Sequence, residues 1–195
     1  MDLSIGDSLV TQTALSLGVG IGLAAAAGLR VFVPLLVLGA AAHAGWIPLT
    51  SDFAWLASTS SLAILGVATV VEIAAYYVPW VDNVLDLIAG PLAVLAGVAA
   101  TAAVMTDLPP ALRWSAAIIA GGGTAAVVQG LTSLTRLKSS AVTGGLANPL
   151  LATIELGGSI ATSFLVIVLP IVALIVVLAI VWIGWRIGRR RAMRP

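Results

Sequence analysis

Two glutamates lie in or beside apolar stretches of the chain, and they are its strongest candidates for chemistry. Glu72 follows a mostly apolar stretch, and Glu155 directly precedes the last apolar run. A carboxylate in an apolar medium is paired with a base, protonated by desolvation, or part of an ion path. On a helix, Thr69 and Tyr76 would share the face of Glu72 and could hydrogen-bond it. We predict that Glu72 and Glu155 coordinate a cation or change protonation, with a structural ion pair as the alternative.

Arg30 lies between two apolar segments. It follows the small-residue stretch Ala24–Gly28 and precedes an apolar run that contains Pro34. An arginine at the centre of a membrane helix costs about 2.5–3.5 kcal/mol on insertion scales, so its guanidinium must be paired, line water or extend to an interface. We predict that Arg30 pairs with the glutamates or contacts an anion inside the bundle. An orienting charge at a helix end is the alternative.

The segment from residue 131 to residue 155 is the least hydrophobic part of the interior. Thr143-Gly144-Gly145 permits unusual backbone angles, and Asn148-Pro149 is typical of the place where one helix stops and another begins. Irregular backbone at membrane depth persists only where protein buries it or water reaches it. We predict a re-entrant element here, with a surface loop as the alternative. The predicted ion- or substrate-binding residues are Arg30, Glu72, Lys138, Ser140, Thr143, Gly144, Gly145, Asn148 and Glu155.

Three other charged residues form a secondary set. Asp82 and Asp86 stand four residues apart, next to Asn83, and would share one helix face. Two carboxylates and an amide suit a hard cation, but both acids also favour a helix N-terminus, which is the preferred interpretation. Arg136, with Lys138, would suit a phosphate headgroup at an interface.

No motif of a known catalytic or metal site occurs in the sequence. There are no cysteines, and the single histidine, His43, has no other ligand type beside it, so a zinc site is not expected. G-x-S-x-G, P-loop and H-E-x-x-H patterns are missing. A net charge of +1 offers no basic face for nucleic acid. We expect no cofactor, no metal and no nucleic-acid partner, and an enzyme is not indicated.

Membrane helices must position these residues. The chain is 61% hydrophobic and 9% charged, whereas a soluble domain carries about 25% charged residues. Its apolar runs are continuous rather than alternating, which excludes a transmembrane β-barrel. We predict an all-α membrane protein, a polytopic helical bundle with broken or re-entrant helices, that forms a single membrane domain over residues 1–195.

Prolines, glycines and polar links divide the apolar sequence into segments near the ~20 residues that a span needs. The expected spans are 11–28, 61–79, 83–106, 111–131 and 156–185, with a shorter segment at 31–44. Pro170 predicts a break or a steep tilt in the last of them. The basic tail, residues 186–195, predicts a cytoplasmic C-terminus. The acidic N-terminus does not resemble a signal peptide, and the expected location is a bacterial inner membrane.

A weak internal repeat relates the two halves of the chain, 10–106 and 111–185. Residues 20–29 resemble residues 122–131, and in each half a glutamate precedes a proline in the next apolar run. Repeated halves with discontinuous helices place substrate sites near the bilayer midplane. Chance similarity between alanine- and glycine-rich segments is the alternative.

At these residues the sequence resembles a bacterial family of small integral membrane proteins known as domain of unknown function 4126. The residues that carry the resemblance are Gly28-Leu29-Arg30, Pro34-Leu35, Glu72, Pro79, Asp82, Asp86, Pro91, Lys138, Ser140, Thr143-Gly144-Gly145, Asn148-Pro149 and Glu155. The chain departs from the family pattern at Ala152, where the family has a serine, although Thr153 is adjacent. The resemblance implies a membrane protein with these site residues and implies no activity.

Three functions remain open from the sequence. The leading hypothesis is a small transporter or channel-like protein, in which broken helices line a polar path for an ion or small solute and a homodimer encloses it. The second is a lipid-handling protein that grips a phosphate headgroup. The third is an accessory membrane subunit whose polar residues only hold helices together.

Overall fold

A computed structural model of the chain describes residues 3–78 and 81–170, and every regular element in this part is a helix. The elements are α1 (Leu3–Leu29), α2 (Phe32–His43), the 3₁₀ helix η1 (Ser51–Ala57), α3 (Thr59–Tyr76), α4 (Val81–Val104), α5 (Pro110–Ala116), the π-helical segment η2 (Ala117–Gly122), α6 (Gly123–Thr143) and α7 (Asn148–Val168). The predicted all-α bundle is confirmed.

Five helical segments are long and apolar enough to cross a membrane. They are Val10–Leu29, Thr59–Tyr76, Leu87–Val104, Pro110–Thr143 and Asn148–Val168, and α2 is a shorter apolar helix. Large apolar side chains cover the outer faces of these helices, as at Val67 and Val71 on α3 and Ile119 in η2. Exposed apolar surface of this extent marks contact with lipid or with another protein, and on helices long enough to span a bilayer it indicates lipid. The chain is therefore a multi-pass membrane protein.

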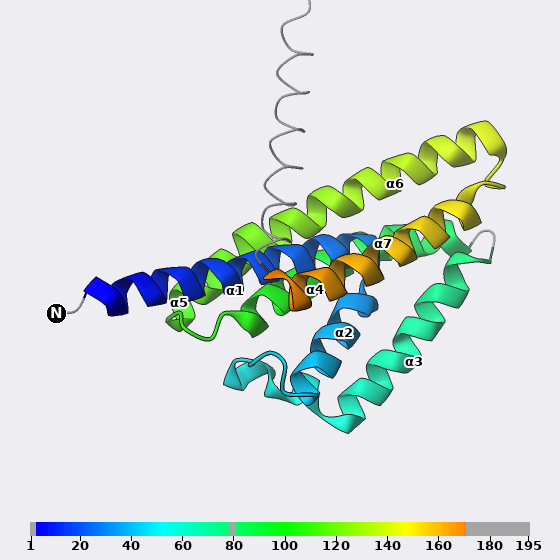
Figure 1. Ribbon diagram of the computed structural model, residues 1–195. Coiled ribbons are helices and arrows are strands. Elements are labelled where there is room, and N and C mark those ends of the chain that lie inside the picture. Colours follow the sequence, from blue (N-terminus) through cyan, green and yellow to red (C-terminus); the bar gives the residue numbers. More distant parts are fainter. Residues whose placement is uncertain (1–2, 79–80, 171–195) are drawn as a thin grey trace, which may run out of the picture.

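Helix α1 is the centre of the bundle and packs against α4, α6 and α7. Figure 1 shows these four helices side by side, with α2 and α3 diverging from them as a V. Small residues allow the close approach: a Cβ on Gly20 would lie 2.7 Å from the Cγ2 atom of Thr101, and one on Gly97 would lie 2.7 Å from the Cβ of Ala125. Small residues at interfaces are the usual basis of helix packing in membranes, where water supplies no drive for association.

Helices α1 and α2 are consecutive helices separated by a short break. Helix α1 ends at Leu29 and α2 begins at Phe32, so Arg30 and Val31 form the break, as the sequence predicts. Pro34 stands in the first turn of α2, where a missing backbone N–H is harmless. The break leaves the first backbone N–H groups of α2 without partners inside the helix, and these groups become part of the site described below.

The segment after residue 131 is helical over most of its length. Helix α6 continues to Thr143, and irregular backbone is confined to the turn of residues 144–147 before α7 begins at Asn148. Residues 131–143 contain neither glycine nor proline, so no residue in this stretch interrupts the helix. The turn itself forms as expected, because Gly144 and Gly145 adopt positive φ angles of 63° and 87° that favour glycine.

Helix α7 ends at Val168, and Leu169 leaves helical geometry with φ −132° and ψ 66° just before Pro170. The break that the sequence places near Pro170 therefore lies at Leu169. The remainder of the last expected span and the basic tail lie outside the described residues. The internal repeat and the re-entrant element stay predictions.

Candidate functional site

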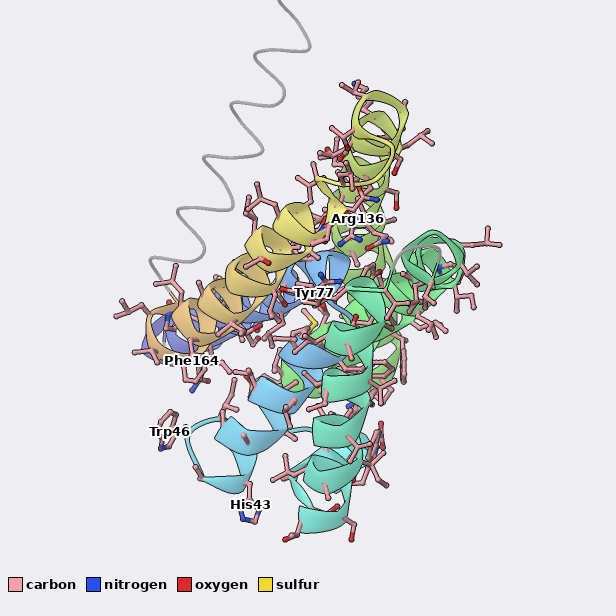
Figure 2. The ribbon with its side chains drawn as sticks, turned by 90° about the vertical axis from the view of Figure 1, so that its right-hand side faces the viewer. His43, Trp46, Tyr77, Arg136 and Phe164 are labelled. Atoms are coloured by element: carbon pink, nitrogen blue, oxygen red, sulfur yellow. The ribbon has the colours of Figure 1, made fainter. Side chains whose placement is uncertain are left out.

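Glu155 on α7 joins two buried arginines from different helices. Arg136 on α6 donates from Nε to Oε1 of Glu155 at 3.1 Å and from Nη2 to Oε2. Arg30, at the end of α1, brings its Nη2 within 3.6 Å of the same Oε2 atom. The exposed fractions of Arg30 and Arg136 are 2% and 3%. Figure 2 shows Arg136 reaching from α6 toward α7. Two buried cations thus share one carboxylate.

The guanidinium groups of both arginines also lie against one aromatic ring. The Cζ atom of Arg30 is 3.8 Å from the centroid of the Tyr76 ring, and the Cζ atom of Arg136 is 4.2 Å from it. Such contacts stabilise a desolvated cation through the negative face of the ring. In addition, Nη2 of Arg30 donates to the backbone carbonyl of Ala152 at 2.8 Å. The end of α3 and the middle of α7 are thereby tied to the end of α1.

Glu72 on α3 binds the broken end of α2. The backbone N–H of Val31 donates to its Oε1 at 2.7 Å, and that of Phe32 donates to its Oε2 at 3.1 Å. These are among the N–H groups that the break leaves free, and the N-terminus of a helix carries about half a positive charge. The expected partner Thr69 instead donates to the carbonyl of Leu65 at 2.7 Å.

The structure brings some of the predicted residues together and leaves others apart. Arg30, Glu72, Glu155 and Arg136 meet with Tyr76 in one place, hereafter the charge cluster. A second group lies in or beside the turn between α6 and α7 and consists of Ser140, Thr143, Gly144, Gly145 and Asn148.

In that turn, Nδ2 of Asn148 donates to the Oγ of Ser140 at 3.0 Å, and the Oγ1 of Thr143 accepts from the N–H of Ala147 at 3.3 Å. These bonds close the turn. Lys138 is exposed on α6. The side chains of Asp82 and Asp86 lie outside the described part.

A model of one protein family matches residues 17–190 of the chain, and the family is described as a domain of unknown function, DUF4126. The match covers most of the chain and contains the whole charge cluster. The chain belongs to the DUF4126 family. No curated protein and no solved structure is significantly similar to it.

The opposite end of this DUF4126 protein holds a second charged pair that the sequence does not reveal. Arg113 on α5 donates from Nη2 to Oδ2 of Asp52 on η1, and the rings of Phe53 and Trp114 lie beside them with centroids 6.0 Å apart. Asp52 and Arg113 are too far apart in the sequence for helical spacing to join them. The position of Tyr76, in contrast, one turn after Glu72, was a usable signal.

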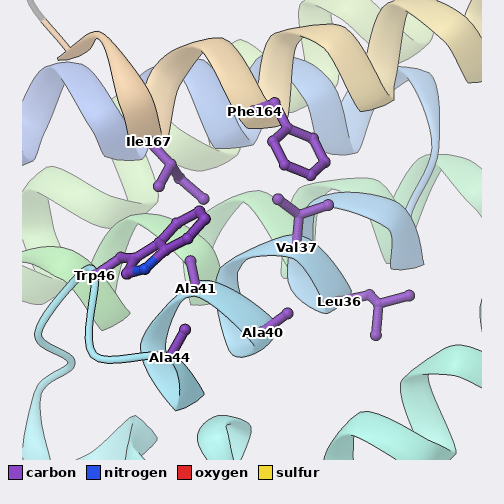
Figure 3. Close-up of a pocket in the computed structure, with 8 residues that line it drawn as sticks. All are labelled: Leu36, Val37, Ala40, Ala41, Ala44, Trp46, Phe164 and Ile167. Carbon is purple, nitrogen blue, oxygen red and sulfur yellow. The ribbon is translucent and has the colours of Figure 1, made fainter.

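Two hollows of this DUF4126 protein lie beside α2 and α3. One, of about 230 Å³, is lined by apolar residues of α2 and α7 together with Trp46, and Figure 3 shows Phe164 and Ile167 facing Val37 and Ala41 across it. The other, of about 440 Å³, is a groove between α3 and α4 whose wall includes Glu72 and Tyr76. The second hollow brings the outer surface of the bundle to the charge cluster.

Among the described residues, no group of three or more histidine, cysteine or acidic side chains is placed to hold a metal ion. The charge cluster itself contains two guanidinium groups that touch Glu155, while Glu72 is engaged by backbone N–H groups. Its donors therefore outnumber its acceptors.

Proposed function

We propose that this DUF4126 protein is a small transporter or channel-like protein that moves an ion or small solute through the membrane. The observation that carries the proposal is the charge cluster, buried at the break between α1 and α2. Ionisable groups within membrane helices are costly and are retained chiefly for function. In many transporters the substrate site forms where a helix is interrupted, because the free helix ends supply polar groups.

The hydrogen bonds of the charge cluster join several helices, which supports a coupled movement of these helices during transport. Arg30 ties α1 to α7 through the carbonyl of Ala152, Glu72 ties α3 to α2, and Arg136 ties α6 to α7. Any change at one of these polar groups alters the packing of several helices together. Alternating access requires such a coupled rearrangement around a central site.

The groove between α3 and α4 supplies a route toward the cluster. Its wall is formed by apolar side chains such as Val71 and Ile88 and reaches Glu72 and Tyr76. With only five candidate spans in the described residues, a homodimer would help to enclose a path. The basic tail, residues 186–195, supports a cytoplasmic C-terminus in a bacterial inner membrane.

A non-catalytic accessory subunit is the second candidate. It is favoured by the internal pairing of both carboxylates, since each oxygen of Glu72 and Glu155 accepts a hydrogen bond from the protein. A lipid-headgroup site has less support, because Lys138 is exposed whereas Arg136 is buried, so the two bases do not converge.

Flux through proteoliposomes distinguishes these candidates. The purified protein is reconstituted, and uptake of sodium, potassium, protons, chloride and phosphate is compared for the wild type, Glu72→Gln, Glu155→Gln and the control Asp52→Asn. We expect flux of at least one ion in the wild type, its loss or marked reduction in both glutamate variants, and its retention in Asp52→Asn. Absence of flux, or equal flux in all four proteins, would exclude the transport proposal and favour the accessory role.

A further inference from the structure

We propose that the charge cluster binds an anion through the guanidinium of Arg30. This inference rests on the proposed function only in assigning the anion as the transported species, because the binding itself is measurable without transport. It begins from the donors of Arg30 that the protein leaves unused.

Arg30 is almost completely buried, yet only part of its hydrogen-bonding capacity is used. Its Nη2 atom donates to the Ala152 carbonyl at 2.8 Å and lies 3.6 Å from Oε2 of Glu155. Its Nε and Nη1 atoms are buried and have no hydrogen-bond partner among the residues that the structure describes. A guanidinium presents five N–H donors and no acceptor. Buried charged donors of this kind require an acceptor, and an anion is a strong acceptor for a guanidinium.

The neighbouring acids do not meet this requirement. Both oxygens of Glu155 accept from Arg136, so Arg30 shares a carboxylate that is already engaged. Both oxygens of Glu72 accept from backbone N–H groups of α2. Among the described residues, both carboxylates of the cluster thus already accept hydrogen bonds, whereas Nε and Nη1 of Arg30 still lack an acceptor. This unmet hydrogen bonding favours a halide or a small oxyanion over a cation.

The surroundings of Arg30 limit the size of the anion. A Cβ on nearby Gly28 would lie 2.6 Å from the Cβ of Val128 on α6, and the ring of Tyr76 covers the guanidinium at 3.8 Å. Such close packing favours a compact group over a bulky one. The group is either a free anion or the phosphate of a lipid whose chains lie in the groove between α3 and α4, and the two sources share the same chemistry.

Anion-dependent thermal stability tests this inference. An anion that binds only the folded state raises the Tm as its concentration rises. The full-length protein in phosphatidylcholine nanodiscs is heated in chloride, nitrate, formate or phosphate at constant ionic strength, with gluconate as the bulky replacement anion. We expect the Tm of the wild type to rise with at least one small anion in a saturable manner.

Variants assign the effect to Arg30. Arg30→Lys keeps the charge but removes Nε and Nη1, so the apparent anion affinity should weaken at least tenfold. The matched control is Arg113→Lys, a buried arginine at the other end of the bundle, which should bind as the wild type does. If Arg30→Lys does not fold, Glu155→Gln serves instead: it removes the competing carboxylate, and a small anion should raise its Tm by more than that of the wild type.

The outcomes separate this inference from the transport proposal. A wild-type Tm that does not respond to any small anion, or an equal response in Arg30→Lys, overturns the anion site. Saturable stabilisation by an anion without flux supports the anion site and excludes transport. Cation flux without stabilisation by any anion supports transport and excludes the anion site. A response to soluble anions that is stronger in a phosphate-free maltoside detergent than in phosphatidylcholine nanodiscs identifies the lipid phosphate as the source that occupies the site in the membrane.

Discussion

Glu72 and Glu155 are the same residue type in similar apolar settings, yet the protein neutralises them by different means. Glu155 faces two guanidinium groups, each a full positive charge. Glu72 faces the first backbone N–H groups of α2, where the helix supplies about half a charge. The partners of Glu155 are arginine side chains. The partners of Glu72 are backbone N–H groups, which are available only because the helix is broken at Arg30 and Val31.

This difference shows that the break has two roles. It exposes backbone donors that hold Glu72, and it directs Arg30 from the end of α1 toward α7. A continuous helix would satisfy those backbone groups internally and leave Glu72 without them. The two glutamates therefore stabilise different parts of the break, and substitution of each should have a different effect on stability.

The largest effect is expected for Glu155→Gln. The amide removes the negative charge of Glu155, which contacts both Arg136 and Arg30, and loss of one partner from a buried ion pair costs about 3–5 kcal/mol. The free energy of unfolding, measured by denaturant titration in a mild detergent, should fall by this amount. Asp52→Asn is the control, because its carboxylate is 54% exposed and such pairs contribute about 0–1 kcal/mol. Equal losses of unfolding free energy in the two variants would show that the buried pair contributes no more to stability than the exposed one.

A smaller loss is expected for Glu72→Gln. The amide oxygen still accepts from one backbone N–H of α2, but the second N–H loses its charged acceptor, at a cost of about 1.5–3 kcal/mol. The backbone amides of Val31 and Phe32 should exchange with solvent faster in the variant than in the wild type, as measured by hydrogen exchange. If Glu72→Gln lost as much stability as Glu155→Gln, Glu72 would have to face a full cation, and the contrast between the two glutamates would not hold.

The smallest effect is expected at Tyr76, whose ring touches both arginines. Tyr76→Phe keeps the aromatic face, while Tyr76→Leu removes it and keeps an apolar side chain. The difference in unfolding free energy between these two variants isolates the cation–π contribution, which we expect to be about 0.5–2 kcal/mol in favour of phenylalanine. Indistinguishable stabilities would mean that the ring serves only as packing between the guanidinium groups.

Local sequence signals located several parts of the site correctly. The break at Arg30, the start of α7 at Asn148 and the glycine turn before it all depend on residues that act within a few positions. Low hydrophobicity between residues 131 and 143, in contrast, does not by itself indicate whether the backbone there is regular. Helix formation in that stretch depends on backbone compatibility, which serine, threonine, lysine and arginine there do not disturb.

What the sequence determined by itself is membrane residence, helical class and the identity of the charged residues that must be accommodated. Each follows from composition, from segment length or from the cost of burying a charge. Only the tertiary structure decided the pairing: Arg30 meets the Ala152 carbonyl 122 residues away, and Val31 meets Glu72 at a separation of 41 residues. No local pattern encodes such contacts, because they depend on how α1, α3, α6 and α7 pack. That packing left Nε and Nη1 of Arg30 buried without an acceptor among the described residues.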